Sequence, residues 1–185
     1  MIISVGTGIG SGIILGGKIL GGFNFAAGEM GHTVIVKDGR QCNCGRKGCW
    51  ERYASARALS DDTREAMKDA PESVMWKIAG DLDHVNAKTA FDGMAQGDET
   101  AKKVIGNWLE YVGCGIANVV NTFEPEVVCI GGGVSNQGEV LLAPVRAYVE
   151  KETHNITTGR CPEIRACVLR NDAGVIGAAA LENSI

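Results

Sequence analysis

Residues 42–51 of the sequence read CNCGRKGCWE and place three cysteines within eight positions. His32 precedes the first of them by ten residues. One imidazole and three thiolates are the ligand set of a closed, tetrahedral zinc site with no position left for a substrate. The pattern therefore predicts a structural zinc ion held by His32, Cys42, Cys44 and Cys49. A reactive thiol cluster is the alternative interpretation.

Two glutamates flank these ligands. Glu29 stands three residues before His32, and Glu51 stands two residues after Cys49. A metal ion that fixes His32 and Cys49 would also fix both carboxylates, which could then accept hydrogen bonds from the hydroxyl groups of a sugar. The alternative is that each glutamate is an ordinary solvated side chain.

A glycine-rich stretch, GTGIGSG at residues 6–12, follows an apolar segment at residues 2–5 that we expect to be a strand. A second strand is expected at residues 13–15, and a hairpin turn at residues 16–18. The glycine spacing matches neither a Walker loop nor a dinucleotide fingerprint. A strand, rather than a helix, follows the glycines, which fits a hairpin that cradles phosphates, as in actin-like ATPases. Taken alone, the stretch is more typical of a tight hairpin without a ligand.

A second group of glycines, Gly131, Gly132 and Gly133, follows an apolar segment expected to be a strand at residues 127–130. Ligands of open α/β sheets bind beyond the carboxyl ends of the strands. Glycines at that edge allow a flat base to lie against the backbone, although a plain strand-to-helix turn has the same sequence.

The rest of the chain predicts further elements. We expect a strand at Thr33–Val36, helices from Trp50 onward, and a new helix near Pro71. The clearest helix opens at Gly97-Asp98, and the glycines inside it, Gly113 and Gly115, indicate close packing. Further on we expect a helix at residues 140–152, a strand at Ile164–Leu169, and a last helix at Ala173–Leu181. This alternation predicts an α/β fold with parallel strands.

Composition narrows the class of protein. The 185 residues carry a net charge of −4, which argues against a nucleic-acid-binding surface. The sequence has no apolar run long enough for a membrane span and no secretory start, so we expect a cytoplasmic protein. The chain has seven cysteines, and a disulfide framework is not expected in a cytoplasmic protein of this size. We expect the four cysteines outside the cluster to be small core residues: Cys114, Cys129, Cys161 and Cys167.

Two motifs together resemble the ROK family (repressors, open reading frames, kinases). Residues 29–32, EMGH, resemble its E-x-G-H motif, and residues 42–51 resemble its C-x-C-G-x-x-G-C-x-E signature. The resemblance implies an actin-like, ribonuclease-H-like ATPase fold with a zinc-binding loop. It also implies that residues 1–185 form the C-terminal sugar- and zinc-binding domain. The N-terminal lobe, with the first phosphate loop and the aspartate base, is expected to be absent from this sequence.

The resemblance further implies roles for individual residues. Glu29, His32 and Glu51 would bind a hexose, and Gly8 would lie near the transferred phosphate. The ATP site would include Gly6, Thr7, Gly8, Gly131, Gly132 and Gly133. ATP and Mg²⁺ would act in the full-length kinase, and we expect no catalytic residue among these 185.

The implied function is ATP-dependent phosphorylation of a glucose-type hexose, and the fragment alone is expected to be inactive. The alternative is the sugar-sensing domain of a ROK transcriptional repressor. In the family the last helix packs against the lobe expected to be absent. We therefore expect its apolar positions to be covered in a homodimer: Val175, Ile176, Ala179 and Leu181.

Overall fold

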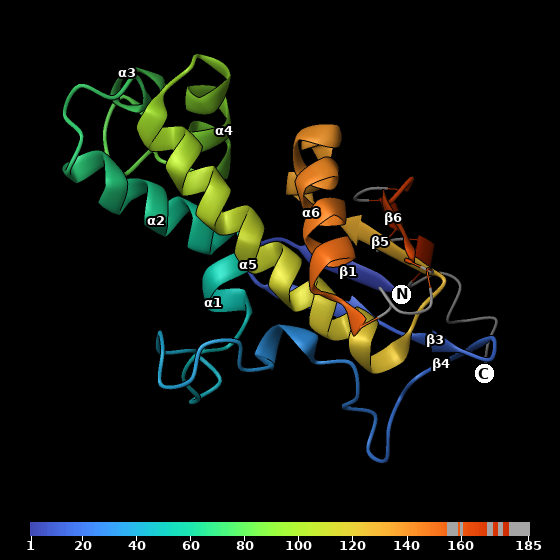
Figure 1. The fold of residues 1–185 in the computed structure, drawn as a ribbon. Coiled ribbons are helices and arrows are strands. Elements are labelled where there is room, and N and C mark those ends of the chain that lie inside the picture. The colour runs from blue at the N-terminus through green and yellow to red at the C-terminus, as the bar shows by residue number, and fades with distance from the viewer. Residues whose placement is uncertain (155–158, 160, 170–171, 174–175, 178–185) are drawn as a thin grey trace.

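The structure, a computed structural model, describes residues 1–154, 159, 161–169, 172–173 and 176–177 (Figure 1). Within these residues a four-stranded sheet has the order β2-β1-β5-β6. Strand β1 (Ile2–Val5) is antiparallel to β2 (Ile9–Gly12) and parallel to β5 (Val127–Gly131), which is parallel to β6 (Glu163–Ala166). Because Ser4 is in register with Gly131, the residues that follow β1 and β5 meet at one edge of the sheet.

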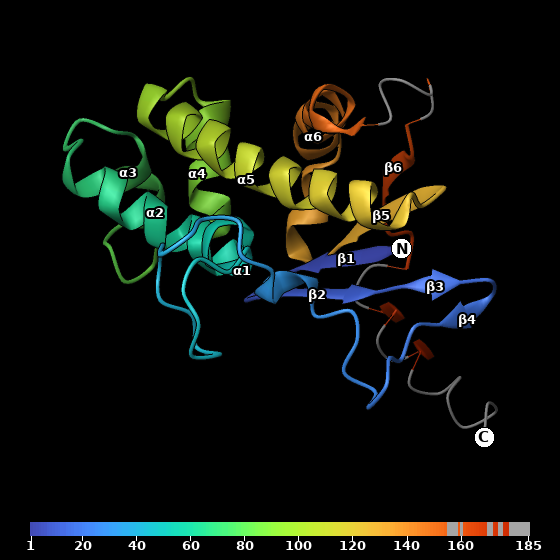
Figure 2. The same ribbon diagram turned by 60° about the horizontal axis from the view of Figure 1, so that its bottom comes forward.

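The two longest described helices, α5 (Glu99–Phe123) and α6 (Glu139–Glu152), pack against each other over one face of the sheet (Figure 2). Four shorter helices lie on the side of α5 away from β6 (Figure 1); three of them contact α5, and the other packs on its neighbour. They are α1 (Glu51–Ala54), α2 (Ala56–Lys68), α3 (Met75–Ala79) and α4 (Ala87–Ala95). There are also two described 3-10 helices: η1 (Met30–His32) precedes the cysteine loop, and η2 (Gly133–Gln137) begins at the last glycine of the second glycine segment.

One cluster of buried apolar side chains joins the sheet to the helices. Ile3 of β1 and Ile130 of β5 are fully buried, as are Trp50 and Trp108. The ring of Trp108 meets Phe91 of α4 edge to face, with 5.9 Å between centroids. The helical part is therefore fixed to the sheet by a shared core. No helix in the described part of the chain is both long and apolar enough to cross a bilayer.

Several elements confirm the sequence prediction. Asp98 caps α5, and Glu124 ends it in a left-handed conformation just before Pro125. The hairpin of β3 (Ile14–Leu15) and β4 (Lys18–Ile19) turns at Gly16-Gly17, both at positive φ. Strand β5 and helix α6 lie where the pattern placed them.

Other predictions were wrong. Thr33–Val36 is not a strand: Val34 forms only an isolated bridge with Cys49, and the amides of Ile35 and Val36 both donate to the Gly48 carbonyl. The backbone there pairs with the cysteine loop instead of a sheet. The glycine loop is shorter than expected, because residues 9–12 form β2 and only residues 6–8 form the turn. Strand β6 ends at Ala166.

The helical predictions also needed correction in one region. Pro71 does not begin a helix, since α2 ends at Lys68 and α3 begins at Met75, and α4 was not predicted.

The four cysteines outside the cluster are not core residues: Cys161 is exposed, and Cys114, Cys129 and Cys167 are partly buried. The last helix expected at Ala173–Leu181, with its apolar positions, lies largely outside the described residues.

Candidate functional site

The four predicted metal ligands converge on one point. The ligand atoms of His32, Cys42, Cys44 and Cys49 all lie within 4.8 Å of one another. The sulfur atoms of Cys44 and Cys49 are 3.6 Å apart, and Nδ1 of His32 is 3.7 Å from Sγ of Cys42. A tetrahedral zinc ion with bonds of about 2.0–2.3 Å separates its ligands by about 3.5–3.8 Å. Two ligand pairs thus have the spacing of a tetrahedral zinc site, and the whole set lies close enough together to close around one zinc ion.

Local backbone geometry explains why the loop folds this way. Gly48 adopts a φ of +79°, and a Cβ there would lie 1.7 Å from the Val36 carbonyl oxygen, so only glycine fits. The loop is also fixed to α1. The phenol oxygen of Tyr53 accepts a hydrogen bond from the Arg40 amide at 2.6 Å, and the Arg40 guanidinium lies 4.6 Å above the Tyr53 ring.

The three thiols differ in their environments. Burial raises the pKa of Cys42 to about 12, and the nearby Glu51 carboxylate contributes to that rise. Burial also raises the pKa of Cys49. A hydrogen bond from the Arg46 backbone lowers the pKa of the exposed Cys44. A bound zinc ion would override these differences, because a thiol that coordinates a metal loses its proton.

Glu51 connects the cysteine cluster to the glycine turn. Its Oε1 accepts a hydrogen bond from the Cys42 thiol at 3.1 Å and lies 3.6 Å from Nδ1 of His32. Its Oε2 lies against Gly8. The structure thus brings together three of the four predicted sugar-site residues. The side chain of Glu29 is exposed, and the Glu29 carbonyl accepts a hydrogen bond from the His32 amide at 3.1 Å.

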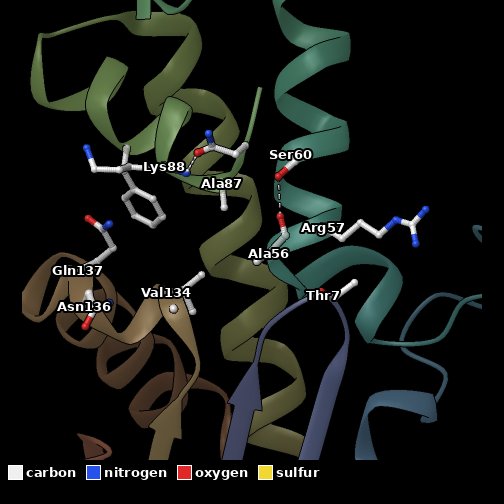
Figure 3. Close-up of a pocket in the computed structure, with 12 residues that line it drawn as sticks. Thr7, Ala56, Arg57, Ser60, Ala87, Lys88, Val134, Asn136 and Gln137 are labelled. Atoms are coloured by element: carbon white, nitrogen blue, oxygen red, sulfur yellow. Dashed lines mark hydrogen bonds between the residues drawn. The ribbon is translucent and has the colours of Figure 1, made fainter. Parts of the chain in front are cut away.

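The two glycine segments lie side by side at the edge of the sheet. A Cβ on Gly132, which has a φ of +87°, would lie 2.1 Å from the Val5 carbonyl oxygen, so the turn after β5 packs directly on the end of β1. Beside them lies a cavity of about 500 Å³, lined by Thr7 of the first turn and Gly133 of the second (Figure 3).

Other residues of this cavity were missed by the sequence interpretation. Lys88 of α4 lies on one side with Asn136 and Gln137 of η2, and its ammonium group pairs with Asp92 at 2.5 Å; Arg57 of α2 lies on the other side (Figure 3). The lining includes these two cationic side chains and no carboxylate among the described residues. A signal for α4 was present: Asn86 and Thr89 form a capping box at its start.

The sequence model described as "ROK family" matches residues 1–184. The chain belongs to the ROK family. It is 37% identical to a glucokinase of Thermotoga maritima over 97% of this chain and 56% of that protein. It is 40% identical to a glucokinase of Halalkalibacterium halodurans over 96% of this chain and 54% of that protein. The chain thus spans about half the length of these curated relatives.

Repressors are also among the relatives. The chain is 33% identical to a xylose repressor of Caldicellulosiruptor bescii over 97% of this chain and 44% of that protein. Among solved structures, a ROK family glucokinase from Streptomyces griseus in complex with glucose and AMPPNP matches with a TM-score of 0.89. That match has 34% identity and covers 97% of this chain and 59% of the other. The likeness supports the predicted actin-like α/β fold.

Proposed function

We propose that this chain is the C-terminal, sugar- and zinc-binding lobe of an ATP-dependent hexose kinase of glucokinase type. Support comes from the glucokinase relatives and from the similarity to a glucokinase that binds glucose and AMPPNP. The observation that carries the proposal is the cavity at the two glycine turns, because its size and charge suit a nucleotide. Repressors share the fold, so the fold alone does not favour a kinase.

In this proposal the phosphates of ATP lie at the first turn, with Gly6, Thr7 and Gly8, and the adenosine lies beside residues 131–133. Backbone amides in glycine turns bind anions well, since no side chain blocks the approach. Arg57, on the side of Thr7, would add positive charge for the phosphates, and no carboxylate among the described residues of the lining would repel them. Lys88 lies on the side of η2, where its ammonium group pairs with Asp92. Mg²⁺ would arrive with the nucleotide.

The hexose would bind beside Glu51 and His32, close to Gly8, and the exposed side chain of Glu29 would turn toward it. In the structure Nδ1 of His32 faces Cys42, which leaves Nε2 for a sugar hydroxyl. A zinc ion at the cluster would have a structural role, fixing His32 and the segment from Cys49 to Glu51. Glu51 would accept a hydrogen bond from the sugar close to the phosphate turn. The contribution of this lobe to phosphoryl transfer is thus to position both substrates.

The aspartate base that accepts the proton of the attacking hydroxyl would belong to the N-terminal lobe of the kinase. No residue of the present site is assigned that role. The second candidate is the sugar-sensing domain of a transcriptional repressor, which the 33% identity to a xylose repressor favours. The two candidates differ in whether the cavity at the glycine turns binds a nucleotide.

Calorimetric titration of the chain with AMPPNP and Mg²⁺, and separately with glucose, tests the proposal. We expect binding of both, and we expect Arg57→Ala to weaken AMPPNP binding about tenfold by removing a charged contact to phosphate. Arg165→Ala is the matched control, since Arg165 is exposed on β6 and outside the cavity lining. Glucose binding without any AMPPNP binding would favour the repressor instead.

A further inference from the structure

A second cavity of about 540 Å³ lies away from the glycine turns. It is formed where α5 and α6 pack against each other, next to α2 and to Arg40 of the cysteine loop. Figure 1 shows α5 crossing between α2 and α6. None of the residues assigned above to sugar, ATP or zinc lines this cavity, so it requires a separate explanation.

Two tyrosines form walls of the cavity. Tyr148 of α6 packs on Gly113 of α5, where a Cβ would lie 2.6 Å from its ring. A glycine inside a helix costs about 1 kcal/mol relative to alanine, so space for this ring is kept at the expense of helix stability. Tyr111 packs on Tyr53, with 4.9 Å between ring centroids. Both phenol rings are partly exposed and line the hollow.

The charge of the cavity is negative. Arg40 is already engaged: its guanidinium forms an ion pair with Asp62 at 2.9 Å and donates to the Arg52 carbonyl at 3.0 Å. Glu110 also lines the cavity, and it forms no ion pair with any residue that the structure describes. Its charge acts on Lys151, whose pKa is raised by Glu152 and to a smaller extent by Glu110. Burial raises the pKa of Tyr148, with smaller contributions from Cys114, Glu152 and Glu110. A phosphate or carboxylate ligand would be repelled here.

We propose that this cavity binds a small organic ammonium ion. The Glu110 carboxylate would pair with the ammonium group, and the faces of Tyr111 and Tyr148 would add cation–π attraction. The amide of Asn107, which also lines the cavity, would hydrogen-bond a polar group on the ligand. The volume falls within the range of about 300–1,000 Å³ that small-molecule sites occupy.

The cavity also has a structural connection to the cysteine cluster. The Trp50 indole donates a hydrogen bond to the Tyr111 carbonyl at 2.8 Å. The same indole occupies the space left by Gly115, and Trp50 directly joins Cys49 to Glu51. A ligand that moves Tyr111 would therefore also shift the indole of Trp50. Any consequence for hexose binding rests on the function proposed above, whereas occupancy of the cavity does not.

Indole N–H signals in ¹⁵N NMR spectra test the proposal with neither sugar nor nucleotide present. The probes are 4-aminobutan-1-ol, butane-1,4-diol and 4-hydroxybutanoate, which share one carbon chain and differ in charge. We expect the amine to shift the Trp50 signal saturably, and each of the other two to bind at least about tenfold more weakly. The Trp76 indole, held by the carbonyls of Met67 and Ala70, is the internal control and should not move.

Substitutions at two exposed residues test whether the amine binds in this cavity. Glu110→Gln and Asn107→Ala should each weaken binding of the amine, Glu110→Gln by about tenfold. The matched controls Glu150→Gln and Asn118→Ala change exposed residues of α6 and α5 outside the cavity and should leave it unchanged. Equal shifts from all three probes, equal shifts of Trp50 and Trp76, or unaltered binding by Glu110→Gln would each overturn the proposal.

Discussion

The carboxylate of Glu51 occupies the space that a side chain on Gly8 would take: its Oε2 lies 2.6 Å from the position of a Cβ at Gly8. The other oxygen of the same carboxylate is 3.1 Å from the Cys42 sulfur. One side chain thus links the metal cluster to the turn proposed to hold the transferred phosphate. Gly8 does not have a positive φ, so a larger residue there would conflict with the Glu51 carboxylate and not with the backbone conformation.

Gly8→Ala should therefore push Glu51 out of place. We expect hexose binding to weaken about tenfold, since the carboxylate loses its position between the cluster and the turn. Calorimetry with glucose measures this. Gly10→Ala is the control, because a Cβ at Gly10 meets no atom within 4 Å. Equal affinities for the two variants would show that Glu51 does not contact the sugar.

Zinc removal should destabilise the chain. Purified protein should contain about one zinc ion per chain. A chelator should lower the melting temperature, because the free energy of zinc binding contributes to the stability of the folded chain. Cys49→Ser should abolish the stoichiometric zinc. Cys161→Ser, at an exposed position outside the cluster, should retain it. A metal-free protein with an unchanged melting temperature would rule out a structural zinc ion.

The metal cluster could be predicted because its spacing is local: three of four ligands lie in one loop, and the fourth is brought near by η1. The glycine turns could be predicted because strands end at them. The positions of Lys88 and Arg57 could not be predicted, because these residues line the cavity only after α4 and α2 have packed beside the edge of the sheet. The strand predicted at Thr33–Val36 was wrong because β-branched residues form a strand only where a partner strand is available.

Asp98 should make a large, pH-dependent contribution to stability. It accepts hydrogen bonds from the Ala101 amide at 2.8 Å, the Ser73 hydroxyl at 2.7 Å and the Val74 amide at 2.8 Å. Burial opposes ionisation, but these bonds outweigh it and lower the pKa of Asp98. Asp98→Ala should reduce the free energy of unfolding by about 2 kcal/mol. Urea denaturation at neutral pH measures that loss.

The sign of the pH effect follows from the lowered pKa. The contribution of the charged Asp98 is complete above its unfolded-state pKa of about 4, and it is lost as pH falls through the lower folded-state value. Asp98→Asn retains an acceptor without the charge. The stability difference between the native chain and Asp98→Asn should therefore shrink as the pH falls below about 4. A difference that stays constant with pH would contradict the role of the charge.

Two glycines of α5 should respond in opposite ways to alanine. A Cβ at Gly106 meets nothing within 4 Å, so Gly106→Ala should stabilise the chain by about 1 kcal/mol through helix propensity. A Cβ at Gly115 would lie 1.9 Å from the Trp50 ring. Gly115→Ala should destabilise the chain by about 1–3 kcal/mol, since it overpacks the core.

The same Gly115→Ala change should displace the Trp50 indole from the Tyr111 carbonyl, while Gly106→Ala should leave that hydrogen bond intact. Guanidinium denaturation gives the two stabilities, and the Trp50 indole N–H signal reports the bond. If both variants were stabilised equally, the indole would not be packed on Gly115. The link from the second cavity to Glu51 would then lose its physical basis, because it runs through the fixed position of Trp50.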